Sequence, residues 1–209
     1  MLFFGHIGAT MGAAKACNIL ASMIKPSNSH EPNSSSRFDM AIGSGRLHLY
    51  ELWNRLKHRT GSIDYRMVLL GSLLPDIIDK PVWLFVSSDT LLSGRNYAHT
   101  LLLHLILFIG GLVLIRYKKS WLLIISLSSF MHLILDQMWN SPVVLLWPLL
   151  GPLPKEEISG WLYNIFKELF TQPAVYIPEI IGLLIVILFA YRLVMRKNAI
   201  SFLKDGTLG

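Results

Sequence analysis

The chain has 209 residues, of which 53% are hydrophobic and 15% charged, and its formal net charge is +6. A soluble domain carries about a quarter charged residues, and here the apolar residues are gathered into blocks long enough to cross a bilayer. The single cysteine, Cys17, excludes an intramolecular disulfide and a zinc site built from cysteines. The composition therefore favours one integral membrane domain, residues 1–209.

Apolar blocks predict the membrane-spanning helices. The first, 2–24, is rich in small residues, and Gly8 and Gly12 stand four apart, which allows close approach of another helix. It lacks the basic start of a signal peptide, so we expect it to remain as a helix. Four further spans are expected at 67–86, 98–115, 121–135 and 180–195. Because backbone groups in lipid must be satisfied internally, the predicted fold class is an all-α bundle of about five spans.

Two segments outside these spans are predicted to lie on the membrane surface. Residues 25–66 combine a polar loop with a basic amphipathic helix, which suits an anionic cytoplasmic surface. Nucleic-acid binding is the alternative for this basic patch, and we favour the membrane. Residues 141–178 contain an apolar stripe at helical spacing, which predicts a second interfacial helix, on the outer face. The stripe consists of Trp161, Leu162, Ile165, Phe166, Leu169 and Phe170.

The distribution of basic residues predicts the orientation. Fourteen of the 19 Lys and Arg lie in 25–66, 116–119 and the segment from 192 onward. Five spans place these three segments on one side, which the positive-inside rule makes cytoplasmic. The amino terminus is then expected outside and the carboxy terminus in the cytoplasm.

Ionisable side chains inside the predicted spans indicate a functional site, because charged groups are costly in lipid. Asp76 and Asp79 are spaced i, i+3, and His132 and Asp136 are spaced i, i+4, so each pair shares a helix face. The predicted topology brings the set toward the outer leaflet, with Asp76 nearer the middle of the membrane. The candidate metal ligands are His6, Asp76, Asp79, His99, His132 and Asp136.

This ligand set suits a divalent metal, with zinc preferred and manganese or iron as alternatives. Such an ion polarises an ester or phosphoryl oxygen and makes bound water acidic enough to supply hydroxide near neutral pH. Asp79 and Asp136 are candidate catalytic carboxylates, and Arg95 is the candidate anion contact. Asp79 could instead form a structural ion pair with Lys80 or Arg95. His104 lies about 140° around the helix from His99 and is not expected among the ligands.

These residues resemble the LexA-binding, inner membrane-associated hydrolase family, also described as membrane-bound metal-dependent hydrolases. The family pattern is an early His before small residues, Pro-Asp-x-x-Asp, an Arg segment ending in His-Ser or His-Thr, and His-x-x-x-Asp. The chain matches with His6 before Gly8 and Gly12, Pro75 to Asp79, Arg95 with His99 and Thr100, and His132 to Asp136.

The resemblance covers residues 1 to about 140 and has four departures, one of which is a cytoplasmic insertion at 25–66 that is longer than usual in the family. Gly94 stands where the family often has a further His, Asn96 stands in place of Gly, and Ala98 in place of Thr. The resemblance implies an inner-membrane, metal-dependent hydrolase. With lipids around it, we expect a lipid-borne ester or phosphoester near the outer leaflet as the substrate. The alternatives are a transport or proton-relay protein, and a non-enzymatic membrane protein with a structural metal site.

Overall fold

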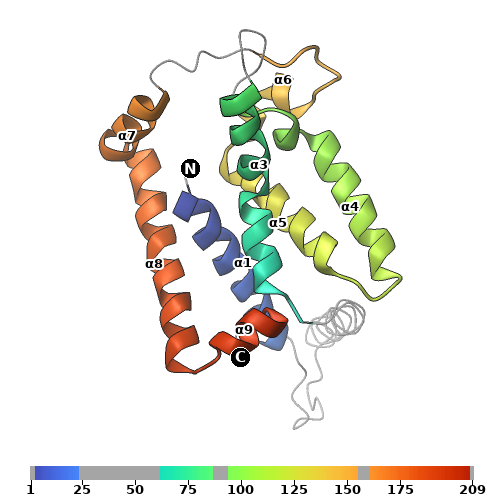
Figure 1. Cartoon of the computed structure of the whole chain (residues 1–209), viewed down its shortest axis with the longest axis vertical. Helices are drawn as coiled ribbons and strands as arrows, with labels where there is room; N and C mark the ends of the chain where they lie inside the picture. Colours follow the sequence, from blue (N-terminus) through green and yellow to red (C-terminus); the bar gives the residue numbers. More distant parts are fainter. Residues whose placement is uncertain (1–2, 24–61, 87–93, 155–160, 208–209) are drawn as a thin grey trace, which may run out of the picture.

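The computed structural model describes residues 3–23, 62–86, 94–154 and 161–207, and within these ranges the chain forms helices and no β-strand (Figure 1). The long helices are α1 (Phe3–Met23), α3 (Tyr65–Val86), α4 (Leu101–Ile115), α5 (Trp121–Leu135) and α8 (Pro173–Met195). The short helices are η1 (Tyr97–His99), η2 (Met138–Asn140), α6 (Pro142–Leu145), α7 (Trp161–Thr171) and α9 (Ala199–Asp205). The predicted all-α class is confirmed for these residues.

Each predicted span contains a long helix, but two of the predicted starts are wrong. α8 begins at Pro173 rather than near 180, because proline suits the first helical position, where no intrahelical N–H partner is needed. Pro178 then lies inside the helix without ending it, so residues 173–178 of the predicted interfacial segment 141–178 belong to α8. α4 begins after 98, because the Thr100 hydroxyl caps it by accepting the Leu103 N–H at 3.3 Å.

The long helices pack as neighbours in the order α8, α1, α3, α5, α4 (Figure 1). Glycines set two of these crossings by close backbone approach. Gly8 of α1 meets the backbone of Gly182 on α8, with no room for a Cβ at either position. A Cβ built on Gly71 of α3 would lie 2.6 Å from the carbonyl oxygen of Ile125 on α5. Small residues thus bring α1 and α3, which carry site residues, against their neighbours.

Helix length and composition distinguish α8 from the other helices. Among the described residues, it is the one helix both long and apolar enough to cross a bilayer by itself. α4 and α5 are apolar but have 15 residues each, which gives about 22 Å against a hydrocarbon core of about 30 Å. α3 has 22 residues but includes four charged ones: Arg66, Asp76, Asp79 and Lys80. These measures alone therefore do not establish five spans.

The basic segment predicted at 25–66 lies outside the described residues except for 62–66. This short stretch joins the start of α3 to the end of α9, where the Tyr65 N–H donates to the Gly206 carbonyl at 2.9 Å. The Arg66 guanidinium donates to the Leu203 carbonyl at 2.7 Å and pairs with Asp64 at the same distance. Burial raises the pKa of the Asp64 carboxyl, but hydrogen bonds and charge from Arg66 outweigh burial and hold that pKa below its usual value.

Candidate metal centre

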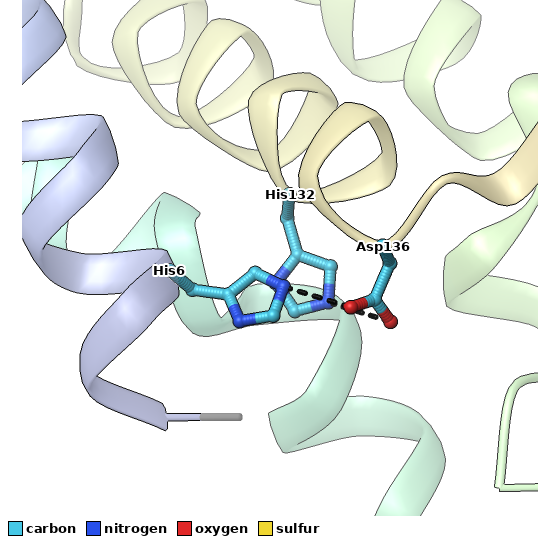
Figure 2. Close-up of side chains that lie close together, drawn as sticks. All are labelled: His6, His132 and Asp136. Carbon is cyan, nitrogen blue, oxygen red and sulfur yellow. Dashed lines mark ion pairs between the residues drawn. The ribbon is translucent and has the colours of Figure 1, made fainter. Parts of the chain in front are cut away.

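Helices from distant parts of the chain bring the predicted His and Asp residues together. α1 contributes one histidine, α3 two aspartates, η1 one histidine, and the end of α5 a histidine and an aspartate. Figure 2 shows His6, His132 and Asp136 pointing toward one another from α1 and α5. The imidazoles of His6, His99 and His132 are fully buried.

The partner of His132 defines which of its ring nitrogens is free. His132 Nδ1 lies 2.7 Å from the backbone carbonyl oxygen of Ser72 on α3. A carbonyl only accepts hydrogen bonds, so Nδ1 carries the proton and donates, and Nε2 of the neutral ring carries a lone pair. His132 Nε2 is buried and has no hydrogen-bond partner among the described residues. The ring is therefore held with an unused electron pair facing inward.

His99 is held in the same way by Asp79. His99 Nδ1 lies 2.7 Å from Asp79 Oδ2, and His99 Nε2 is buried without a hydrogen-bond partner in the described part of the chain. Asp79 also accepts the backbone N–H groups of Asn96 at 2.6 Å and Ala98 at 3.0 Å. Asp79 thus lies behind His99 and not beside the free nitrogens. Because Asn96 and Ala98 hold Asp79 through backbone groups, these departures from the family pattern preserve the contacts.

Asp76 faces both free imidazole nitrogens. Its Oδ1 atom lies 3.8 Å from His99 Nε2 and 3.8 Å from His132 Nε2. Its Oδ2 atom accepts the Lys80 ammonium at 2.6 Å, which leaves Oδ1 directed at the imidazoles. The donor atoms of Asp76, His99 and His132 all lie within 4.8 Å of one another. Two imidazoles and one carboxylate are a common ligand set for a catalytic divalent metal.

A second group shares His132 with the first. His6 Nε2 lies 3.0 Å from Asp136 Oδ1, and the rings of His6 and His132 stack with centroids 3.9 Å apart (Figure 2). The donor atoms of His6, His132 and Asp136 also lie within 4.8 Å of one another. Arg95, which is about half exposed, pairs with Asp136 Oδ2 at 3.0 Å. The structure therefore places the predicted Arg95 at the open edge of this group.

The ion pairs suggested for Asp79 are not those that form. Lys80 pairs with Asp76 and Arg95 with Asp136, while Asp79 is bound by His99 and backbone N–H groups. His104 lies apart from both groups, as expected, but His99 belongs to η1 and the extended Thr100 separates it from α4, so the predicted 140° angle along one helix does not apply. His104 Nδ1 donates to the Thr100 carbonyl at 2.8 Å, and its Nε2 lies 2.9 Å from the Ser129 hydroxyl.

Glu179 of α8 was not among the predicted site residues, although it supports one of them. Its carboxylate is buried and accepts the backbone N–H groups of Phe4 at 2.8 Å and Gly5 at 3.1 Å. These are among the N–H groups at the start of α1 that lack an intrahelical acceptor, and the helix dipole favours a negative charge there. Phe4 and Gly5 directly precede His6, so Glu179 fixes the turn that carries this histidine. A lone acidic residue within an apolar helix was the available signal.

The fold and the site define an α-helical membrane protein whose buried His and Asp side chains face the interior of the bundle. A family model for the YdjM inner membrane protein matches residues 40–200, and the chain belongs to this family. The matched range contains every candidate site residue except His6. No curated protein and no solved structure matches the chain. Family membership confirms the inner membrane as the location; it makes no statement about hydrolysis.

Proposed function

We propose that this protein is a membrane-bound, metal-dependent hydrolase that acts on a lipid-borne ester or phosphoester. The observation that carries the proposal is the pair of buried imidazole nitrogens, His99 Nε2 and His132 Nε2, each 3.8 Å from Asp76 Oδ1. A buried polar atom without a partner is costly, and a bound cation would remove this cost at two atoms at once. Zinc is the first candidate, with manganese and iron as alternatives.

The ligands and their supports divide into separate roles. Asp76, His99 and His132 would hold the ion, which when bound makes water acidic and polarises the bond under attack. Asp79 and the Ser72 carbonyl hold the two imidazoles in the tautomer that exposes Nε2, which is the usual role of groups behind metal-binding histidines. Asp79 is thus proposed as a positioning residue and not as a ligand.

The neighbouring group supplies acid–base and anion-binding functions. Asp136, bound to His6 and Arg95, is the carboxylate that would take a proton from the attacking water. Its partner His6 would enter the ligand set only when this pair opens. Arg95 is exposed enough to meet a substrate, and its planar guanidinium can bind a phosphate through two hydrogen bonds.

The site end of the bundle is proposed to face the outer leaflet. The basic residues at 116–119 and 192–197 follow the ends of α4 and α8 that lie away from the start of α1 (Figure 1), and the positive-inside rule makes that end cytoplasmic. Single cysteines introduced at Lys118 and Asn140, both exposed, in a Cys17→Ser background test this. A membrane-impermeant maleimide added to intact spheroplasts should label position 140 alone. Labelling of position 118 alone would reverse the orientation.

Metal analysis of the detergent-purified protein tests the proposed function. Wild type should contain about one zinc, manganese or iron ion per chain, since the two groups share the single free nitrogen of His132. A His99→Ala/His132→Ala double variant should contain none, and a His104→Ala variant should match wild type. A phosphodiesterase or esterase activity lost on chelation and restored by metal would then support hydrolysis. A wild-type protein without metal would overturn the proposal and favour a proton relay through the same residues.

A further inference from the structure

A deep apolar groove of about 740 Å³ lies between α4, α5 and the segment after α6. Leu102, Leu105 and Phe108 line it from α4, and Leu127 and Phe130 line it from α5. Its volume falls within the range of small-molecule binding sites. The groove is separate from the candidate metal centre, whose side chains do not line it.

The groove follows from how α4 and α5 pack. Near their connecting turn the two helices are in close contact, since a Cβ on Gly111 would lie 2.8 Å from the Leu123 Cα. Residues 145–149 line the groove farther from this turn. Leu145 and Trp147 of this segment pack against a buried cluster formed by Leu133, Met138, Val144 and Leu153. The segment is therefore fixed to the protein core.

The lining selects an apolar ligand. Among its described residues, His104, Ser126 and the indole N–H of Trp147 supply the polar side-chain groups, and none of the lining residues is a lysine, arginine or carboxylate. Both ring nitrogens of His104 are already engaged, by the Thr100 carbonyl and the Ser129 hydroxyl. The groove therefore offers hydrocarbon contact and no free cation for an anionic group.

The groove lies beside the candidate metal centre along the chain and in space. His99 faces Asp79 on one side of the start of α4, while His104, five residues later, lines the groove. The ring of Tyr97, two residues after Arg95, packs edge-on against Trp147 of the groove wall with centroids 5.2 Å apart. The segment that carries Arg95 thus contacts the wall of the groove through Tyr97.

We propose that this groove holds the hydrocarbon chain of the lipid substrate while its ester or phosphoester lies at the metal centre. The inference rests on the proposed function for the identity of the substrate. The outward face of α4 next to the groove is apolar, with Ile106 and Ile109 more than half exposed. In an inner-membrane protein this face meets lipid tails, so a chain can enter the groove sideways from the bilayer.

Photo-crosslinking tests the groove without requiring activity. The probe is a phosphatidylglycerol with a diazirine in the middle of one acyl chain, present at low abundance in nanodiscs of unlabelled phosphatidylglycerol and phosphatidylethanolamine. Leu105→Trp fills the groove, and Ile106→Trp is the matched control, since the two residues are 55% and 58% exposed on one helix. Label should concentrate on groove residues in wild type and Ile106→Trp, and fall several-fold there in Leu105→Trp.

Leu127→Trp provides the same test from α5, should Leu105→Trp fail to fold. Label spread equally over the lipid-facing side of α4, or unchanged in both groove variants, would overturn the proposal. Protein dimers that form in wild type and disappear in the groove variants would also overturn it, because they would identify a second copy as the occupant.

Chain-length kinetics link the groove to catalysis. The substrates are ethyl and hexadecyl p-nitrophenyl phosphate, which share the scissile bond and differ in the chain. Leu105→Trp should lower the ratio of kcat/KM for the hexadecyl over the ethyl ester about 10-fold, and Ile106→Trp should keep the wild-type ratio. An equal ratio of the two kcat/KM values in all three proteins would show that the groove does not bind the substrate's hydrocarbon chain. Specific crosslinking without turnover of either phosphodiester would refute phosphodiester hydrolysis as the reaction of this site, while the groove would still be shown to bind an acyl chain.

Discussion

α3 and α8 are nearly equal in length, and both contain proline, but α3 carries charged residues of the site whereas α8 mainly exposes apolar side chains. α3 has 22 residues and carries two aspartates, a lysine and an arginine, with Asp79 fully buried against η1. α8 has 23 residues and exposes large apolar side chains along most of its length. Its one buried acid, Glu179, binds the start of α1. α3 thus organises the site, whereas α8 faces lipid and contacts the rest through a narrow stripe.

The largest expected effect comes from the imidazole on α5 that faces α3. His132→Ala removes the one residue that both candidate ligand groups share. Metal content should fall to background and turnover should disappear, a greater loss than the roughly 10 to 100-fold typical of groups behind the ligands. For metal content the control is His104→Ala, which removes a buried histidine that belongs to neither ligand group. Full metal content in His132→Ala would contradict the site.

The second effect tests the positioning role of α3. Asp79→Asn keeps the size of the side chain but weakens acceptance of the His99 Nδ1 hydrogen and of two backbone N–H groups. Metal affinity, measured by competition with a zinc chelator, should fall about 10 to 100-fold. Asp76→Asn should cost more, because Asp76 faces both free nitrogens. A larger loss of metal affinity in Asp79→Asn than in Asp76→Asn would indicate that Asp79, and not Asp76, is the ligand.

The third effect tests the one stripe of α8 that contacts the site. Glu179→Gln retains an oxygen acceptor but loses the negative charge at the start of α1. We expect a loss of stability of about 1 kcal/mol from the weaker charged hydrogen bonds, seen as a lower melting temperature in detergent. Glu179→Ala should in addition lower turnover, since His6, which pairs with the proposed base Asp136, loses its support. Unchanged turnover in Glu179→Ala would limit the role of Glu179 to stability.

The smallest effect should come from the lipid-facing surface of α8. Leu184→Ala and Leu188→Ala shorten side chains that are more than half exposed. Their metal content, melting temperature and turnover should remain within error of wild type, because no cavity forms inside the protein. A marked loss in either variant would mean that another chain covers this face, and the contrast between α3 and α8 would then need revision.

Sequence patterns predicted the helices well and the site in part. Blocks of apolar residues located α1, α3, α4, α5 and α8. This works because a helix in lipid forms all its backbone hydrogen bonds within its own segment, so the segment's own composition indicates it. Helix-face spacing and the common depth of the charged residues predicted which side chains meet. The start of α8 was misplaced, since the span was predicted from 180 whereas α8 begins at Pro173 and continues through Pro178.

The roles within the site depend on tertiary contacts that spacing does not encode. The Ser72 carbonyl acts on His132 as a backbone group, so no side-chain pattern indicates it. Asp79 takes a different role from Asp76 because the segment of η1, 17 to 20 residues later in the chain, packs against Asp79 and binds its carboxylate. Glu179 meets α1 across 174 and 175 residues. The groove arises from the path of residues 145–149 over α4 and α5.

The contact of α1 with α8 has a consequence for the order in which the protein is assembled. Gly182 and the Glu179 carboxylate are synthesised well after the helix that carries His6, since Gly5 and Glu179 are 174 residues apart in the chain. Until α8 is inserted beside α1, the N–H groups of Phe4 and Gly5 lack this carboxylate acceptor. A ribosome that stops before α8 therefore leaves the helix of His6 without the contacts that hold its start.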